Sequence, residues 1–132
     1  MIKLETRNLS YSYHAGQAVL NDISLEIYEG SVTVLLGLNG SGKTTLIKVL
    51  TGLLKPLKGT TFIESKDITQ ISSTELSKLI SYVPQNISDD TDFAVLDYLT
   101  FGRMSTIKFY SAPNAEDYEN AKAVANDLGI TD

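Results

Sequence analysis

The sequence predicts an α/β fold, and three observations support this prediction. Residues 32–36 form a short apolar run, which is typical of a buried parallel strand. A glycine-rich loop follows, and an apolar helical pattern begins at Lys43. A second apolar run at residues 79–83 stops at Pro84 and predicts a further strand. A strand, a loop, a helix and another strand in this order are typical of an α/β domain.

The N-terminal third is expected to be β-structure. Residues 2–9 alternate in part between apolar and polar side chains, and residues 19–27 alternate well near their end. The helix that begins at Lys43 is expected to reach about Leu54, because Pro56 lies just beyond. Residues 60–63 then predict a short strand.

The C-terminal part predicts three helices. Ser72 and Glu75 have capping-box spacing and predict a short helix to about Lys78. Residues 94–101 form a helical pattern that ends at a glycine. Asn114 is a candidate N-cap of the last helix, whose apolar positions share one face before the chain reaches a glycine.

Composition excludes several classes of protein. The 132 residues are 42% hydrophobic and 20% charged, which suits one packed domain or one lobe of a larger domain. A net charge of −5 and the lack of a dense Lys/Arg run argue against a nucleic-acid surface. Because the sequence contains no cysteine, it has no disulfide, thiolate metal site or cysteine nucleophile.

The sequence shows no targeting or membrane-spanning segment. The N-terminus lacks the apolar core of a signal peptide. No apolar run approaches the roughly 20 residues needed to cross a bilayer. We therefore expect a soluble chain, most simply a cytoplasmic one.

Residues 37–45 match the phosphate-binding motif G-x-x-x-x-G-K-[ST]. Glycines allow the backbone to approach phosphate oxygens and present N–H groups to them. Lys43 is expected to reach the β- and γ-phosphates of a nucleotide, and the Thr44 hydroxyl is expected to bind Mg²⁺. His14 is the only histidine, so a metal site built on it is improbable.

Four ordered segments resemble the nucleotide-binding subunits of ABC transporters. Residues 9–13 followed by residues 19–27 resemble the opening sheet of that family, and residues 37–45 its phosphate loop. Residues 51–60 resemble the connection that follows, and residues 82–85 the Q-loop. The resemblance covers essentially the whole chain.

This resemblance implies a P-loop NTPase with an ABC ATPase-type core and an N-terminal antiparallel β-subdomain. Residues 1–85 would form the β-subdomain and the core up to the Q-loop. Residues 86–132 would form the start of the helical subdomain, so the fold is expected to be incomplete at the C-terminus.

A narrower resemblance concerns the transported substrate. Residues 67–69, 76–85 and 95–103 are similar to importer ATPases for iron–siderophore, haem and cobalamin uptake, although amino-acid and export ATPases share much of the pattern. The resemblance implies an ATPase that couples ATP binding and hydrolysis to uptake of a metal chelate.

The resemblance also assigns roles to single residues. Tyr13 matches the aromatic residue that stacks on adenine, with Tyr11 as a rival candidate. Gln85 matches the Q-loop glutamine and would join Thr44 as a Mg²⁺ ligand, and Lys43 and Gln85 would serve catalysis. The complete nucleotide-binding set is Tyr13, Asn39, Gly40, Ser41, Gly42, Lys43, Thr44 and Thr45.

Partners follow from the same resemblance. Residues 86–103 would face a membrane-spanning permease subunit, and a solvated loop and helix is the alternative. A second ATPase subunit would complete a dimer that sandwiches ATP. The assembly would place the chain on the inner face of the cell membrane, as a peripheral protein.

The 132 residues contain no LSGGQ-type signature, no aliphatic run ending in Asp-Glu and no switch histidine. We therefore expect weak ATP binding, negligible hydrolysis by this chain alone, and exposed apolar surface that promotes self-association. The alternatives are a non-catalytic nucleotide-binding or interaction module and a soluble ABC protein without a transport role. A small-molecule kinase is disfavoured, because only Arg103 follows the phosphate loop to clamp phosphates.

Overall fold

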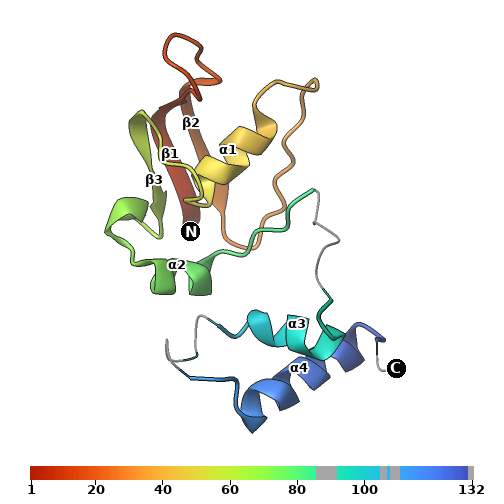
Figure 1. Ribbon diagram of the computed structural model, residues 1–132. Helices are drawn as coiled ribbons and strands as arrows, with labels where there is room; N and C mark the ends of the chain where they lie inside the picture. The colour runs from red at the N-terminus through yellow and green to blue at the C-terminus, as the bar shows by residue number, and fades with distance from the viewer. Residues whose placement is uncertain (86–91, 105–106, 108–110, 131–132) are drawn as a thin grey trace. The chain divides into compact units, whose positions relative to one another are not determined.

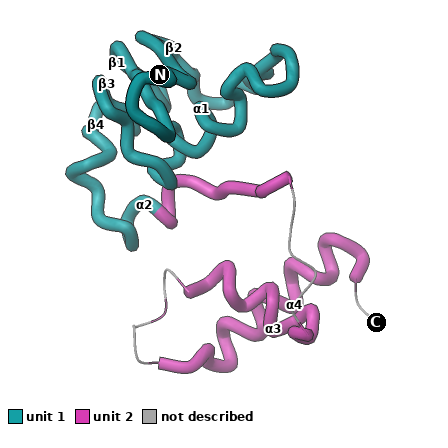
Figure 2. The backbone as a smooth tube through the Cα atoms, turned by 45° about the horizontal axis from the view of Figure 1, so that its top comes forward, with its two compact units in different colours: residues 1–76 teal, residues 77–132 magenta. Residues whose placement is uncertain are grey.

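The computed structural model describes residues 1–85, 92–104, 107 and 111–130. It divides into two compact units, residues 1–76 and residues 77–132 (Figure 2). The predicted division after residue 85 stays a prediction.

The first unit is built on a four-stranded antiparallel sheet. Its strands are β1 (Ile2–Tyr11), β2 (Leu20–Tyr28), β3 (Lys58–Ile63) and β4 (Lys66–Asp67), in the order β2-β1-β3-β4. Helix α1 (Lys43–Leu50) lies against one face of this sheet (Figure 1). The N-terminal antiparallel β-structure predicted from the sequence is confirmed.

The core of the first unit lies between the sheet and α1. Leu9 of β1 and Leu20 of β2 pack with Leu46, Val49 and Leu50 of α1. The three helix residues follow the spacing that brings side chains to one helical face. Their burial anchors α1, and therefore its first turn, to the sheet.

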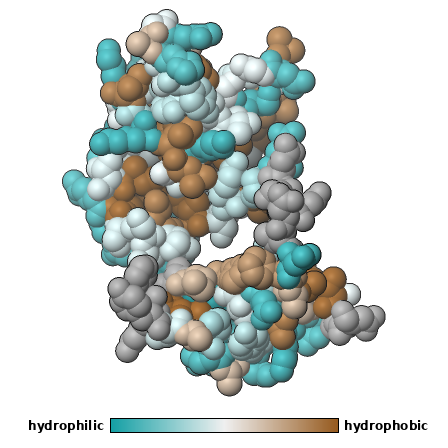
Figure 3. Space-filling model, in the orientation of Figure 1, coloured by the Kyte–Doolittle hydropathy of each residue, from teal (hydrophilic) through white to brown (hydrophobic). Residues whose placement is uncertain are grey.

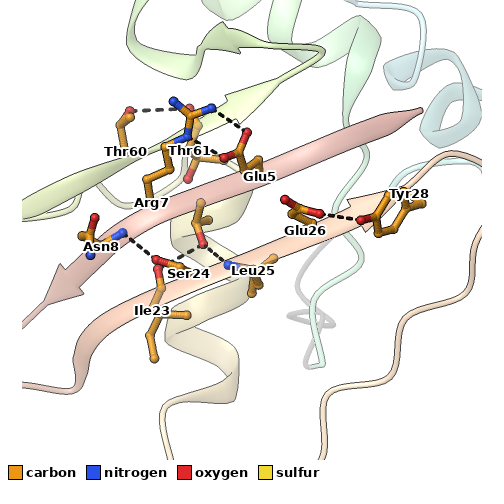
Figure 4. Close-up of polar contacts among 11 residues, drawn as sticks. Glu5, Arg7, Asn8, Ile23, Ser24, Leu25, Glu26, Tyr28, Thr60 and Thr61 are labelled. Carbon is orange, nitrogen blue, oxygen red and sulfur yellow. Dashed lines mark hydrogen bonds and ion pairs between the residues drawn. The ribbon is translucent and has the colours of Figure 1, made fainter.

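Side-chain hydrogen bonds compensate an irregularity between β1 and β2, among them the bond between Asn8 and Ser24 (Figure 4). The register of the two strands shifts just after Thr6, where Asn8 has a φ of +49°. The Thr6 hydroxyl accepts a bond from the Leu25 N–H at 3.1 Å and donates to the Ile23 carbonyl at 3.1 Å. The Asn8 N–H donates to the Ser24 hydroxyl at 2.9 Å. Side chains thus satisfy backbone groups that the shifted ladder leaves unpaired.

The predicted strand at residues 32–36 is wrong for this structure. Although fully described, the segment pairs with no other described residue, and Val32, Val34 and Leu36 are 93%, 71% and 86% exposed. A strand needs a neighbouring chain to accept and donate its backbone hydrogen bonds. In the described sheet β1 already lies between β2 and β3, and the segment does not join either edge.

Helix α1 ends earlier than the predicted Leu54. Its last residue is Leu50, and Gly52 follows with a φ of +75°. The N–H of Gly52 donates to the Val49 carbonyl at 3.1 Å. A glycine in this left-handed conformation is a common way to end a helix.

Two short helical elements complete the first unit and lead into the second. Helix η1 (Ile68–Gln70) has Asp67 as its N-cap, and the Asp67 side chain accepts a bond from the Thr69 N–H at 2.8 Å. Helix α2 (Ser73–Leu79) has the predicted reciprocal bonds between Ser72 and Glu75. The strand predicted at residues 79–83 is wrong, because α2 extends to Leu79 and the next described residues pair with no strand in the described sheet.

The second unit packs α3 (Val95–Phe101) against α4 (Ala115–Asp127). Thr100 of α3 and Ala121 and Ala125 of α4 are buried. Both helices were predicted from the sequence, and the structure confirms them.

Helix α4 has well-formed ends. Asn114 and Asp117 make the reciprocal bonds of a capping box at its start. At its end the Gly129 N–H donates to the Asn126 carbonyl and the Ile130 N–H to the Ala125 carbonyl, the pattern of a Schellman motif. The glycine predicted to end this helix does so.

An ion pair with a buried carboxylate ties the end of α3 to the start of α4. The Arg103 Nε atom lies 3.2 Å from Oδ1 of Asp117, which is 4% exposed. A buried carboxylate is tolerated only when charges and hydrogen bonds compensate it. Arg103 and Asp117 also line an open pocket of about 320 Å³ in this unit.

Candidate functional site

The glycine-rich loop leads into the first turn of α1. Gly40 and Gly42 have φ values of +79° and +89°, and Gly42 is the N-cap of the helix. A Cβ on Gly42 would lie 3.0 Å from the Val19 carbonyl oxygen and 3.2 Å from the Leu20 side chain. Both the backbone conformation and the close approach to the start of β2 therefore favour glycine at this position.

The N-terminus of α1 presents backbone N–H groups with no side-chain cap on its N-cap residue, Gly42. Helix N-termini leave N–H groups without intrahelical partners and carry partial positive charge. The eight-residue helix is held by its buried face, so these groups have a fixed direction. Such a turn is suited to bind an anion such as phosphate.

The Lys43 side chain folds back across the loop. Its ammonium donates to the carbonyl oxygens of Gly37 at 2.8 Å and of Leu38 at 2.6 Å. The same Leu38 carbonyl accepts a bond from the Ser41 N–H at 3.2 Å, which closes a turn in the loop. A cation in the first turn opposes the helix dipole unless oxygen atoms or an anion surround it. The loop thus holds a positive charge beside the helix N-terminus.

Thr44 and Thr45 place their side chains in different environments. Thr44 is exposed, so its hydroxyl is available to a cation bound at the loop. Thr45 is only 6% exposed, and its Oγ1 lies 3.2 Å from the Tyr13 hydroxyl. The nucleotide-binding set predicted from the sequence includes Thr45, but the contact with Tyr13 was not predicted, because residues 13 and 45 meet only in the tertiary structure.

The two rival tyrosines occupy different environments. Tyr11 ends β1 and packs against the hydrophobic core, whereas Tyr13 lies beyond the strand and is 53% exposed. Their rings meet edge to face, with centroids 5.0 Å apart and an angle of 86°. Exposure makes Tyr13 the tyrosine with surface available to a ligand.

Other predicted site residues are exposed. Asn39 and Ser41 are exposed loop residues beside the glycines. Gln85 is an exposed residue of the second unit, and its role as a Mg²⁺ ligand stays a prediction. His14 lies exposed in the loop after β1.

The described residues contain neither a metal-binding cluster nor a membrane-spanning helix. No group of three or more His, Cys, Asp or Glu side chains in this part of the chain is arranged to hold a metal ion. None of the helices in the described ranges is both long enough and apolar enough to cross a bilayer.

A family profile described as ABC transporter matches residues 20–132. An ATP-binding protein named for iron chelatin transport in Helicobacter pylori is 38% identical over 128 residues, covering 96% of this chain and 50% of that protein. The manganese transport system ATP-binding protein MntB of Bacillus subtilis is 37% identical, with 100% of this chain and 51% of that protein covered.

Solved structures agree with these matches. A nucleotide-free ATP-binding cassette from an ABC transporter superposes with a TM-score of 0.82 at 30% identity, covering 99% of this chain and 55% of that one. The cbiO1 protein of Clostridium perfringens, part of the cbiONQ complex, superposes with a TM-score of 0.73 at 29% identity, covering 98% and 51%. The chain spans about half the length of the curated relatives it matches. It belongs to the ABC transporter family and corresponds to part of the ATP-binding subunit.

Proposed function

We propose that the loop before α1 binds the phosphates of ATP. The observation that carries this proposal is the Lys43 ammonium, held across a glycine-rich loop beside the N-terminus of a helix packed on the sheet. Backbone N–H groups, a positive helix end and a cation lie within one short segment. Their combined charge favours a polyanion.

The residues present fit an ATP–Mg²⁺ complex. The backbone N–H groups of residues 39–42 would bind phosphate oxygens, and Lys43 would exchange its two loop carbonyls for the β- and γ-phosphates. Thr44 offers an exposed hydroxyl to Mg²⁺, with Gln85 as a second proposed ligand. Mg²⁺, when bound, neutralises part of the phosphate charge. Tyr13 would stack on the adenine base.

The whole protein is proposed to power uptake of a metal or a metal chelate. The relatives named above are associated with iron chelatin and manganese transport, which favours this substrate class over others. In the assembled transporter, ATP hydrolysis would use Lys43 and Gln85, and a second ATPase subunit would complete the nucleotide site. This role places the chain on the cytoplasmic face of the membrane, as a peripheral subunit.

The proposed permease-docking segment, residues 86–103, is described from residue 92 onward. Here Phe93, Tyr98 and Phe101 are all exposed by about half. Phe101 contacts both other rings, at centroid distances of 5.0 Å from Phe93 and 6.1 Å from Tyr98. Aromatic residues are enriched at protein interfaces, so this cluster supports a docking role.

The 132-residue chain by itself is proposed to bind ATP without hydrolysing it. The sequence contains no aliphatic Asp-Glu run to supply a general base and no signature motif to close the site. An ATP turnover rate near that of a complete ABC ATPase, abolished by Lys43→Ala, would overturn this part of the proposal.

The ATP site can be tested by calorimetry with MgATP. Lys43→Ala should weaken binding at least about tenfold, because a charge-assisted contact to phosphate is lost. Lys48→Ala removes the same charge from the other end of α1 and should bind MgATP like the wild type. Equal binding by the wild type and Lys43→Ala would contradict the proposal.

A further inference from the structure

We propose that Thr45 is a positioning residue that holds the Tyr13 ring in place for the nucleobase. This inference rests on the proposed ATP site and concerns its base-binding side. The contact that carries it is the 3.2 Å approach between the Thr45 and Tyr13 hydroxyl oxygens. It links the base-binding ring directly to the helix that follows the phosphate loop.

Two elements hold the Tyr13 ring. Tyr11, which ends β1 and packs at the core, meets it edge to face at 5.0 Å. Thr45, in the first turn of α1, fixes the hydroxyl end of the ring and is itself 6% exposed. The rest of the ring is accessible, since Tyr13 as a whole is 53% exposed. Tyr11 thus supports the ring and, being partly buried against the core, offers a base less surface than Tyr13 does.

The tether matters because Tyr13 lies in a loop. The residue follows the last residue of β1 by two positions, and β2 does not begin until Leu20. A tyrosine on such a loop would lose side-chain freedom on stacking with a base. A ring that is already held needs less ordering when the base binds. The Thr45 hydroxyl therefore contributes to base affinity without touching the base.

This role differs from a contact between Thr45 and phosphate. A phosphate contact would affect every triphosphate, with or without a base. A contact that acts through Tyr13 would affect only ligands that carry a base. Inorganic tripolyphosphate, which has the phosphates and no base, distinguishes the two roles.

The experiment measures MgATP and Mg-tripolyphosphate affinities of the 132-residue chain by calorimetry. The variants are Tyr13→Phe, Thr45→Val and the double variant. Each single change should weaken ATP binding roughly threefold to tenfold, the range for one lost hydrogen bond. The double variant should be no weaker than the weaker single variant, because the two changes remove one shared contact. Tripolyphosphate affinity should fall by a clearly smaller factor than ATP affinity in all three, because this ligand has no base to stack on Tyr13.

Thr45→Ser keeps the hydroxyl and should retain most of the ATP affinity. This control distinguishes loss of the hydroxyl from a change in packing at this buried site. An equal loss of tripolyphosphate and ATP affinity in Thr45→Val would overturn the inference and assign Thr45 to the phosphates. So would additive losses in the double variant. If the wild type binds neither ligand, the proposed ATP site fails, whereas wild-type binding without coupling refutes only the Thr45 role.

Discussion

Two buried threonines of the sheet differ in whether their hydroxyl has a partner. Thr6 and Thr61 are both 1% exposed. The Thr6 hydroxyl joins two backbone groups of β2. The Thr61 Oγ1 atom is, among the described residues, a buried side-chain oxygen without a hydrogen-bond partner. An isosteric change to valine therefore has opposite consequences at the two positions.

We predict that Thr6→Val lowers the free energy of unfolding by about 1–3 kcal/mol, because the partly buried Leu25 N–H loses its acceptor. Thr61→Val is the matched control and should leave stability unchanged or increase it, since an unpaired buried oxygen is replaced by a methyl group. Urea unfolding of both variants measures the difference. Equal losses at the two sites would contradict the prediction.

Asp67 gives one source of pH dependence. Its Oδ1 accepts bonds from the Thr69 hydroxyl at 2.7 Å and the Thr69 N–H at 2.8 Å, and these bonds hold the pKa of Asp67 below its ordinary value. Since the folded-state pKa is depressed, the stabilisation is present above the unfolded-state pKa of about 3.9. It is lost as the pH falls through the lower folded-state pKa.

We predict that Thr69→Val raises the pKa of Asp67 toward the ordinary value. The substitution removes the hydrogen bond from the Thr69 hydroxyl, which lowers this pKa most, and keeps the bond from the Thr69 backbone N–H. An NMR titration of the Asp67 carboxyl in both proteins measures this. The wild type should also lose stability more steeply than Asp67→Asn in urea unfolding as the pH falls below about 4. An unchanged Asp67 pKa in Thr69→Val would refute the assigned cause.

At the scale of elements, the start of β3 depends on one glycine. Gly59 has a φ of +73°, and a Cβ there would lie 2.2 Å from the Arg7 carbonyl oxygen of β1. Gly30, after β2, has a similar φ of +69° and nothing within 4 Å of the same position. Alanine substitutions at Gly59 and Gly30 therefore distinguish the cost of steric overlap from the cost of backbone strain alone.

We predict that Gly59→Ala destabilises the first unit by roughly 3 kcal/mol or more, because β1 and β3 must move apart. Gly30→Ala should cost only about 1–2 kcal/mol, the penalty for a left-handed alanine. Thermal unfolding followed by circular dichroism gives both values. A Gly59→Ala variant as stable as Gly30→Ala would contradict the close approach between the strands.

At the scale of the whole molecule, apolar side chains reach the surface of both units (Figure 3). In the first unit they include Val32, Val34, Leu35 and Leu36, next to Leu38 of the loop. An exposed apolar segment with free backbone hydrogen-bonding groups favours association between chains. The net charge of −5 opposes association weakly at physiological salt.

We predict that the 132-residue chain self-associates and that Val34→Lys reduces the association, since a charge disrupts an apolar, strand-like contact. Val124→Lys, on an exposed position of α4, makes the same chemical change elsewhere and should have less effect. Sedimentation velocity over a range of concentrations tests both. A wild-type monomer at every concentration would contradict the prediction.

The sequence by itself determined the local features of this protein. Glycine positions, capping residues and the phosphate-loop motif depend on a few consecutive residues, and they predicted α1, the Ser72–Glu75 capping box, the Asn114 N-cap and the end of α4. Alternation of apolar and polar residues predicted β1 and β2, because the polarity of each residue in an amphipathic strand indicates which face of the sheet it occupies.

Only the tertiary structure decided the features that need a distant partner. The apolar run at residues 32–36 has the composition of a buried strand. A strand forms only when a second segment pairs with it, and no described segment does so here. The edge contact between Tyr11 and Tyr13 and the approach of Thr45 to Tyr13 likewise join residues whose distance follows from packing rather than spacing. Local sequence encodes conformational preference, and the hydrophobic packing of α1 on the sheet decides which side chains meet.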